Sequence, residues 1–148
     1  MLLLVCLMLP PAASAQTNGV LREFYSGIGG GSLQAFTNSP SFPASPTSEF
    51  IENAFFEAPS NFADSYGQRM RALLSPPVTG NYVFYIATDD QGALFLSSDE
   101  NPNNRVKIAS ILSWSGSRVW QEPRDGNAAA QKSAPIFLSA GDRYYIEA

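Results

Sequence analysis

Residues 69–109, "RMRALLSPPVTGNYVFYIATDDQGALFLSSDENPNNRVKIA", contain the pattern that decides the fold. Apolar and polar residues alternate along "RMRALL", and "NYVFYIA" places Tyr82, Phe84 and Ile86 on one face of an extended segment and Val83, Tyr85 and Ala87 on the other. The short runs "GALFL" and "RVKIA" continue the series. Turn residues such as Gly, Pro and Asn separate these runs at short intervals. No segment shows a convincing 3.6-residue helical period. The pattern therefore predicts an all-β sandwich or barrel.

The flanking segments extend this prediction. The run "GVLREFYSGI" (residues 19–28) alternates and predicts a first strand, and "APIFLSAGD" and "RYYIEA" predict the last ones. Residues 27–50 are rich in Gly, Ser and Pro, which predicts a long loop without a regular helix or central strand. Its Phe36, Phe42 and Phe50 are expected to pin that loop to the domain. Residues 49–67 are aromatic-rich and irregular.

The N-terminal stretch "MLLLVCLMLPPAASAQ" predicts a secretory signal peptide over residues 1–15, cut before Gln16. A short membrane anchor is the alternative, but the apolar run is well below the roughly 20 residues that span a bilayer. The single cysteine, Cys6, leaves with the signal. The mature domain, residues 16–148, is therefore expected to be extracellular, secreted or at the cell surface, without disulfides and without membrane insertion.

Composition excludes several function classes. The chain has 9 Lys+Arg against 13 Asp+Glu, and the basic residues are scattered, so a nucleic-acid footprint is not expected. There is no histidine, which removes Ser-His-Asp and Cys-His nucleophile systems and histidine metal sites. Carboxylates, hydroxyls, aromatics and backbone carbonyls remain. These groups suit hard cations and sugars.

The run "RYYIEA" reaches residue 148 without a turn behind it. We therefore expect the sequence to be a C-terminally truncated fragment that lacks its final strand or strands. The further domains of the parent chain are then expected partners.

Several motifs occur in a fixed order around the decisive stretch. They are Pro76-Pro77-Val78-Thr79-Gly80, Tyr82-Val83-Phe84, Asp89-Asp90 and Leu94-Phe95-Leu96. Together with "GVLREFYSGIGG" and "QKSAPIFLSAGDRYYIEA", this order resembles the PA-fourteen (protective-antigen-type) domain family over about residues 18 to 148. The resemblance implies an antiparallel two-sheet β-sandwich, jelly-roll-like, of the kind found in secreted adhesins, toxins, glycosidases and bacterial surface proteins.

The same resemblance implies a Ca²⁺ site at Asp89 and Asp90, joined by a cis peptide bond, with the ion coordinating hydroxyls of a bound sugar. The remaining ion ligands are expected beyond Ala148, so calcium binding by this chain is expected to be weak. Side chains of adjacent strand residues point apart, and a cis bond would bring both carboxylates to one ion. The alternative is an ordinary turn, begun by Asp89 and closed by Gln91-Gly92, with Asp90 facing water.

Two further clusters are candidate sugar-binding residues. The loop "SSDENPNNR" carries Asp99, Asn101 and Asn103 beside Glu100 and Asn104, although polar hairpin loops often have this composition. Trp114 and Trp120 lie in a Gly/Ser/Arg-rich loop, where they either stack on sugars or anchor the loop. The run Gly29-Gly30-Gly31 lacks the lysine of a phosphate loop and predicts a flexible loop.

Three functions compete. The first is a non-catalytic module for adhesion that binds glycans or other surface molecules, helped by Ca²⁺. The second is a structural spacer domain of a large surface protein, with no ligand of its own. The third is a glycosidase, which needs two opposed carboxyl groups. Candidates for that pair are Glu49, Glu52, Glu57 and Asp64, but no spacing singles out two of them, so no catalytic residue is predicted.

Overall fold

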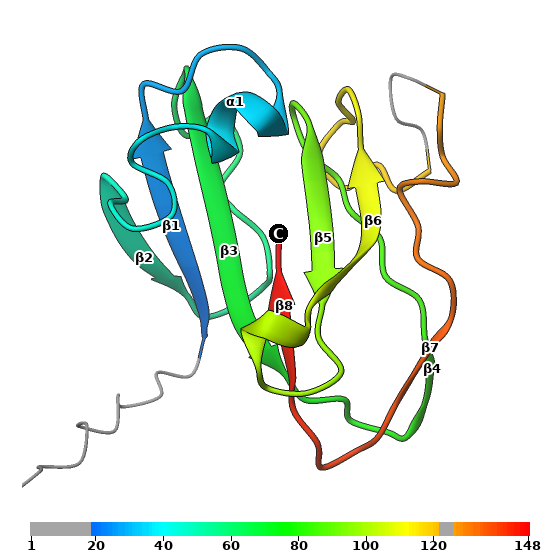
Figure 1. The fold of residues 1–148 in the computed structure, drawn as a ribbon. Helices are drawn as coiled ribbons and strands as arrows, with labels where there is room; N and C mark the ends of the chain where they lie inside the picture. Colours follow the sequence, from blue (N-terminus) through cyan, green and yellow to red (C-terminus); the bar gives the residue numbers. More distant parts are fainter. Residues whose placement is uncertain (1–18, 122–125) are drawn as a thin grey trace, which may run out of the picture.

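The computed structural model describes residues 19–121 and 126–148 (Figure 1). The predicted signal peptide, with Cys6, lies outside this part of the chain. The described elements are β1 (Val20–Ser26), α1 (Leu33–Thr37), β2 (Ser48–Glu52), β3 (Tyr66–Leu74), β4 (Gly80–Tyr82), β5 (Gly92–Leu96), the short 3₁₀ helix η1 (Pro102–Asn104), β6 (Val106–Ile111), β7 (Ile136–Leu138) and β8 (Tyr144–Glu147). The fold is mostly β, as the alternating pattern predicts.

Six strands form the larger sheet in the order β2-β1-β3-β8-β5-β6, and all neighbouring pairs are antiparallel (Figure 1). The last strand, β8, lies in the middle of this sheet, between β3 and β5. Its Glu147 is in register with Arg71 on one side and Phe95 on the other. The first and the last described strands, β1 and β8, therefore belong to the same sheet. Local sequence patterns do not reveal this arrangement.

The smaller sheet consists of β4 and β7, and an isolated bridge between Tyr85 and Lys132 extends the pairing of the two segments. Its inward side chains pack on those of the larger sheet. The shared core contains, among others, Ile86, Leu94, Leu96, Ala109, Ile111, Leu138, Tyr144 and Ile146. The predicted alternation is confirmed here, because Phe84 and Ile86 pack in this core while Val83 is exposed.

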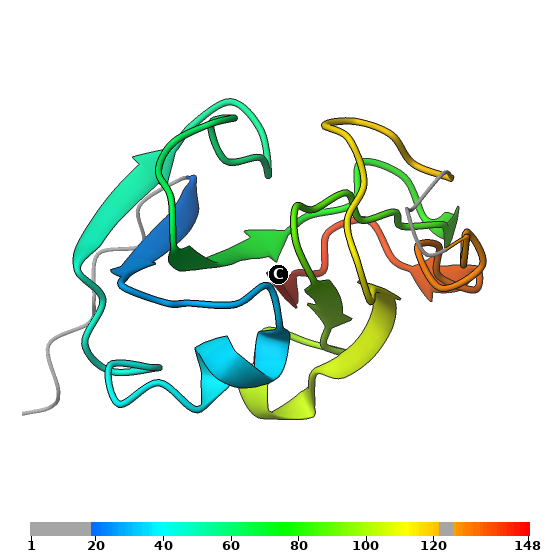
Figure 2. The same cartoon turned by 90° about the horizontal axis from the view of Figure 1, so that it is seen from above.

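A second apolar cluster lies on the other face of the larger sheet, where α1 covers β1 and β3 (Figure 2). It contains Tyr25, Ile28 and Phe36, with Phe42 packed against them. The rings of Phe36 and Phe42 lie 4.7 Å apart, centroid to centroid. The expectation that these two phenylalanines anchor the loop is confirmed.

The prediction that residues 27–50 form no regular helix and no central strand is wrong for α1, whereas the strand that begins there, β2, is not a central one. Ser32 caps α1, because its Oγ accepts a hydrogen bond from the Ala35 amide at 3.1 Å, and Phe36 fixes the helix to the sheet. β2 forms as an edge strand along β1. Edge strands are commonly short and charged, so their pattern is weak in a sequence.

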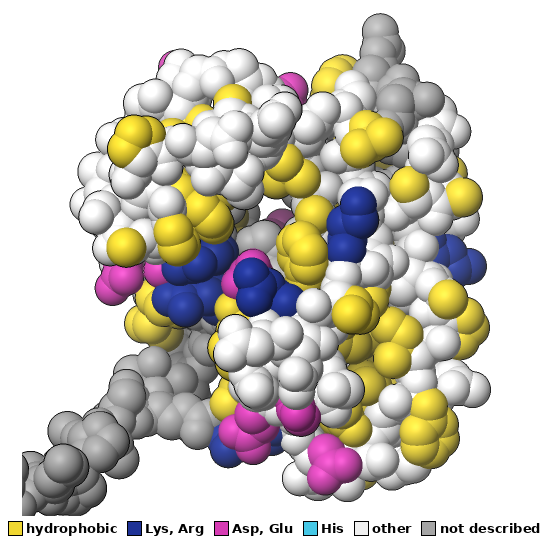
Figure 3. Space-filling model, viewed as in Figure 1, with side chains coloured by type: hydrophobic (Ala, Val, Ile, Leu, Met, Phe, Trp, Pro, Cys, Tyr) yellow, Lys and Arg dark blue, Asp and Glu magenta, His cyan; other side chains and the backbone are white. Residues whose placement is uncertain are grey.

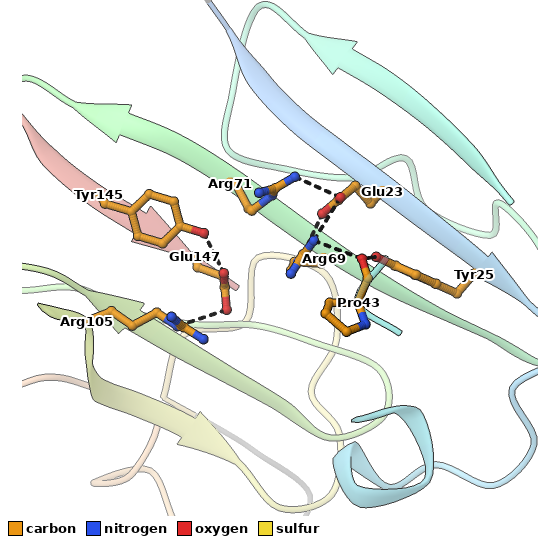
Figure 4. A network of polar contacts seen from close by, with 8 residues as sticks. All are labelled: Glu23, Tyr25, Pro43, Arg69, Arg71, Arg105, Tyr145 and Glu147. Carbon is orange, nitrogen blue, oxygen red and sulfur yellow. Dashed lines mark hydrogen bonds and ion pairs between the residues drawn. The ribbon is translucent and has the colours of Figure 1, made fainter. Parts of the chain in front are cut away.

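Charged side chains lie on the α1 face of the larger sheet, where they gather in a hollow (Figure 3). Glu23 is almost fully buried and accepts hydrogen bonds from both Arg69 and Arg71 (Figure 4). Next to them, the Tyr145 hydroxyl donates to Glu147, which also pairs with Arg105. Burial, and then the hydrogen bond to Glu147, raise the pKa of Tyr145 above its ordinary value.

Within residues 19–121 and 126–148, no helix has the length and apolar character needed to cross a bilayer.

Candidate functional site

Asp89 and Asp90 lie directly before β5, at the end of the larger sheet where β5 begins and β6 ends (Figure 1). Both side chains are exposed. The peptide bond between them is cis, which confirms that part of the expectation. The exposure of both side chains agrees equally with the alternative of an ordinary turn with Asp90 facing water.

Gln91 ties the aspartate pair to two other loops. Its backbone N–H donates to the Gly31 carbonyl oxygen at 3.2 Å, and its side-chain Oε1 accepts from the Leu33 amide at 3.2 Å. The Gln91 Nε2 group donates to the Leu112 carbonyl oxygen at 2.9 Å. The backbone and side chain of this one residue therefore fix the glycine-rich loop, the start of α1 and the loop after β6 relative to the aspartate turn.

The turn itself has an internal hydrogen bond. Thr88 Oγ1 donates to the backbone carbonyl oxygen of Asp90 at 2.7 Å. The Thr88 carbonyl oxygen accepts from the Ser115 amide at 2.7 Å, which connects the turn to the loop after β6 a second time. These bonds hold the backbone that carries the two carboxylates.

Gly31 lies directly against the side chain of Asp90. A Cβ atom added at Gly31 would approach the Asp90 Cβ atom to 2.7 Å, and the carboxylate more closely still. Real Cβ atoms do not come this close to another carbon, so Asp90 or the loop would have to move. The absence of a side chain at position 31 therefore sets where the Asp90 carboxylate lies.

A Gly31→Ala substitution is expected to lower the free energy of unfolding by about 1–3 kcal/mol, the usual cost of overpacking a tight contact. It should also displace the Asp90 carboxylate. The matched control is Gly29→Ala, because a Cβ atom at Gly29 meets nothing within 4 Å. Chemical denaturation of both variants measures the difference. Equal stability of the two variants would contradict this placement of Asp90.

The donor set suits a hard cation only in part. Two carboxylates offer up to four oxygens, whereas Ca²⁺ takes six to eight oxygen ligands, including carbonyls and water. Among residues 19–121 and 126–148 there is no group of three or more His, Cys, Asp or Glu side chains that could hold a metal. The pair fits Ca²⁺ as a partial set of ligands, completed by other oxygens.

The loop candidates Asp99, Asn101 and Asn103 lie at the other end of β5, around η1, and the structure does not bring them to the aspartate pair (Figure 1). Their polar groups bond to one another. Asp99 accepts hydrogen bonds from the Asn101 amide at 2.9 Å and from Asn104 Nδ2 at 2.7 Å. The Asn101 side chain accepts from the Asn103 amide at 3.0 Å and so caps η1. Such bonds are typical of a well-ordered hairpin loop.

The two tryptophans occupy different places. Trp114 is 42% exposed and precedes Ser115, which is bonded to Thr88 beside the aspartate pair. Trp120 is 45% exposed and lines an open recess with Tyr85 and Gln121. Trp114 therefore lies in the part of the loop after β6 that contacts the turn before β5, and Trp120 lies farther along the same loop.

Sequence reasoning missed Thr88, Gln91 and Gly31 as parts of the site. The glycine run was expected to be a flexible loop, whereas Gly31 contacts Asp90. Gln91 and Leu33 are 58 positions apart in sequence, so no local pattern predicts their hydrogen bond. The one available signal was the run of small residues itself, which permits a close approach of backbone to side chain.

The chain matches the PA14 domain family over residues 18–148. It therefore belongs to this family, and the resemblance inferred from the motifs is confirmed.

Three relatives show the range of proteins that carry similar sequence. Canine (Canis lupus familiaris) fibrocystin is 35% identical over 108 residues, covering 68% of this chain and 3% of that protein. Human fibrocystin-L is 26% identical over 154 aligned positions, covering 97% of this chain and 3% of that protein. Mouse N-acetyl-beta-glucosaminyl-glycoprotein 4-beta-N-acetylgalactosaminyltransferase 1 is 32% identical over 84 residues, covering 56% of this chain and 8% of the enzyme. The chain thus spans only a small part of these relatives.

Proposed function

We propose that this PA14 domain is an extracellular, non-catalytic carbohydrate-binding module with a two-sheet β-sandwich fold, and that Asp89 and Asp90 hold a Ca²⁺ ion. One observation carries the proposal: Asp89 and Asp90 are adjacent and exposed, and the contacts of Gln91 and Gly31 fix the turn that carries them. Within the described residues, neither carboxylate has a hydrogen bond or ion pair to a protein donor. Such a pair is available to an ion.

Electrostatics favour a cation at this place. Two neighbouring carboxylates repel each other, and a divalent ion between them turns that repulsion into attraction. Oxygen ligands of this kind suit Ca²⁺ better than Zn²⁺, which prefers nitrogen and sulfur. Once bound, Ca²⁺ supplies open coordination positions for sugar hydroxyls.

The acidic groups weighed for a glycosidase support a non-catalytic role. Glu52 pairs with Arg22 at 2.7 Å, and Glu57 pairs with Arg118 at 2.8 Å. The hydrogen bond from Arg118 lowers the pKa of Glu57, whereas a general acid needs a raised pKa. Glu57 is thus a poor proton donor.

One relative adds context. The mouse transferase is by its name an enzyme that acts on glycoproteins. A module that contacts glycans would be useful beside such an activity, although the matched region is a small part of that enzyme. A spacer without ligand remains the competing function, and the following experiment separates the two.

Calcium is expected to stabilise the purified chain. Extracellular calcium sites have dissociation constants of about 0.1–1 mM, and a partial set of ligands belongs at the weak end of this range. About 10 mM Ca²⁺ should therefore add about 1.4 kcal/mol to the free energy of unfolding. Asp89→Asn and Asp90→Asn should each remove this gain, because each deletes one anionic ligand. Melting in Ca²⁺, in Mg²⁺ and in EDTA measures the effect, and a glycan array in Ca²⁺ then tests sugar binding.

Asp142→Asn is the matched control, since Asp142 is an exposed aspartate near β8, away from the pair. It should keep the full response to calcium. If wild-type protein melts at the same temperature in Ca²⁺ and in EDTA, the calcium site is wrong. If, in addition, no glycan on the array binds, the carbohydrate-binding function is wrong and the spacer function replaces it.

A further inference from the structure

The outer face of the β4–β7 layer contains an open recess that is separate from the aspartate pair. It is lined by Tyr85, Trp120 and Gln121 and has a volume of about 470 Å³. This lies within the range of small-ligand sites, about 300–1,000 Å³. Tyr85 reaches this face because side chains alternate along the extended segment, so that its neighbours Phe84 and Ile86 point into the core.

The walls of the recess are held by buried contacts. Gln131 is fully buried, and its Nε2 group donates to the Val119 carbonyl oxygen at 2.6 Å, next to Trp120. The Gln131 carbonyl oxygen accepts from the Ile86 amide at 3.1 Å, next to Tyr85. One buried residue therefore links the backbones that carry the two aromatic rings. A site fixed in this way loses little entropy when a ligand binds.

The polar groups of the recess complement its aromatic ones. The Lys132 ammonium lies 5.8 Å from the centroid of the Tyr85 ring, and Gln121 contributes an exposed amide. Aromatic faces carry negative partial charge and attract the weakly positive C–H groups on one face of a pyranose ring. The Gln121 amide in the lining can bond to the hydroxyl groups at the edge of such a ring, and the Lys132 ammonium beside Tyr85 can donate to them as well.

We propose that this recess is a second carbohydrate-contact site, in which a pyranose ring stacks on Trp120 and Tyr85 while Gln121 and Lys132 bond to its hydroxyls. The site needs no metal ion. Its ligand class follows from its own lining, so it does not depend on calcium at Asp89 and Asp90.

A protein partner is the other occupant to consider, because exposed Phe137 lies on the same layer. Phe137 is in register with Asn81, four residues along the chain from Tyr85, which corresponds to about 13 Å in an extended strand. It therefore lies beyond the recess. The two aromatic rings and the single amide that line the recess favour a sugar ring.

The test uses ¹⁵N-labelled protein in EDTA, so that the proposed calcium site is inactive. Lactose, maltose, cellobiose and N,N′-diacetylchitobiose are titrated while the indole N–H signal of Trp120 and the amides of residues 84–86 and 131–132 are followed. At least one disaccharide is expected to shift these signals with millimolar affinity. Trp120→Ala should weaken that affinity about tenfold or more, and Tyr85→Ala likewise, because each removes one of the two rings.

Trp120→Phe keeps an aromatic face and should retain part of the binding, which separates lost stacking from a folding defect. Phe137→Ala should leave sugar binding unchanged. The proposal is overturned if none of the sugars shifts these signals, if Trp120→Ala binds as well as wild type, or if binding appears only in Ca²⁺ and vanishes in Asp90→Asn. It is also overturned if Phe137→Ala abolishes binding, since the contact surface would then be the wider apolar face.

Discussion

Glu23→Gln is expected to lower the free energy of unfolding by about 3 kcal/mol. The Glu23 side chain is 3% exposed and compensates the guanidinium groups of Arg69 and Arg71. Glutamine keeps the shape but not the charge, and two arginines are then left beside a neutral partner in a dry environment. The loss should lie at the lower end of the usual 3–5 kcal/mol, because the Arg71 side chain is 33% exposed and keeps some water.

Urea denaturation of wild type and variant measures this loss. The matched control is Glu57→Gln, which breaks the same type of pair with Arg118 at the surface and should leave stability unchanged. A double variant, Glu23→Gln with Arg69→Met, should recover part of the loss because it removes one uncompensated charge. If Glu23→Gln proves as harmless as the surface control, the buried network does not hold β1 to β3.

Ile111→Ala is expected to lower the free energy of unfolding by about 2–5 kcal/mol. Ile111 ends β6, is 1% exposed and belongs to the core shared by the two sheets. Its removal leaves a cavity that the surrounding strands cannot fill completely. Ile111 pairs with Gly92, which lies two residues after Asp90. If Asp89 and Asp90 hold a calcium ion, the stabilisation of the domain by calcium should therefore also become smaller in this variant.

The adjacent Leu112 supplies the control. It is 60% exposed, so Leu112→Ala removes a similar volume from the surface and should change stability by less than about 0.5 kcal/mol. Thermal and urea denaturation of the two variants give the comparison. Similar losses of unfolding free energy in the two variants would mean that the side chain of Ile111, at the end of β6, does not face the core.

The strands after the aspartate pair were predictable as short apolar runs between turn residues. The strand predicted before the pair, over residues 81–87, is shorter than expected, because β4 ends at Tyr82 and only an isolated bridge at Tyr85 follows. Tyr82, Phe84 and Ile86 face the core as their alternation predicts. β2 and α1 were not predictable in the same way. Phe50 and Glu52 of β2 contact Arg22 of the neighbouring strand β1. Phe36 of α1 packs on Tyr25, so both elements depend on contacts with residues distant in sequence.

The candidate site was predictable in its residues and not in its surroundings. The motif order points to Asp89 and Asp90, and the cis bond between them agrees with it. The same reasoning treated Asp99, Asn101 and Asn103 as sugar-binding candidates, although they lie at the other end of β5 and bond among themselves. Composition describes which groups a loop offers, but not whether they are already paired.

The sequence by itself determined the strand pattern, the family and the position of the two adjacent carboxylates, because these properties are local along the chain. Only the tertiary structure decided that Gly31 lies against Asp90 and that Gln91 bonds to the segments around Leu33 and Leu112. It also decided that Trp120 lines a recess with Tyr85, whereas Trp114 lies near the aspartate turn. The reason is physical. Contacts between distant segments depend on which strands pair and which faces pack, and the free energy of those contacts belongs to the whole fold and not to any one stretch of sequence.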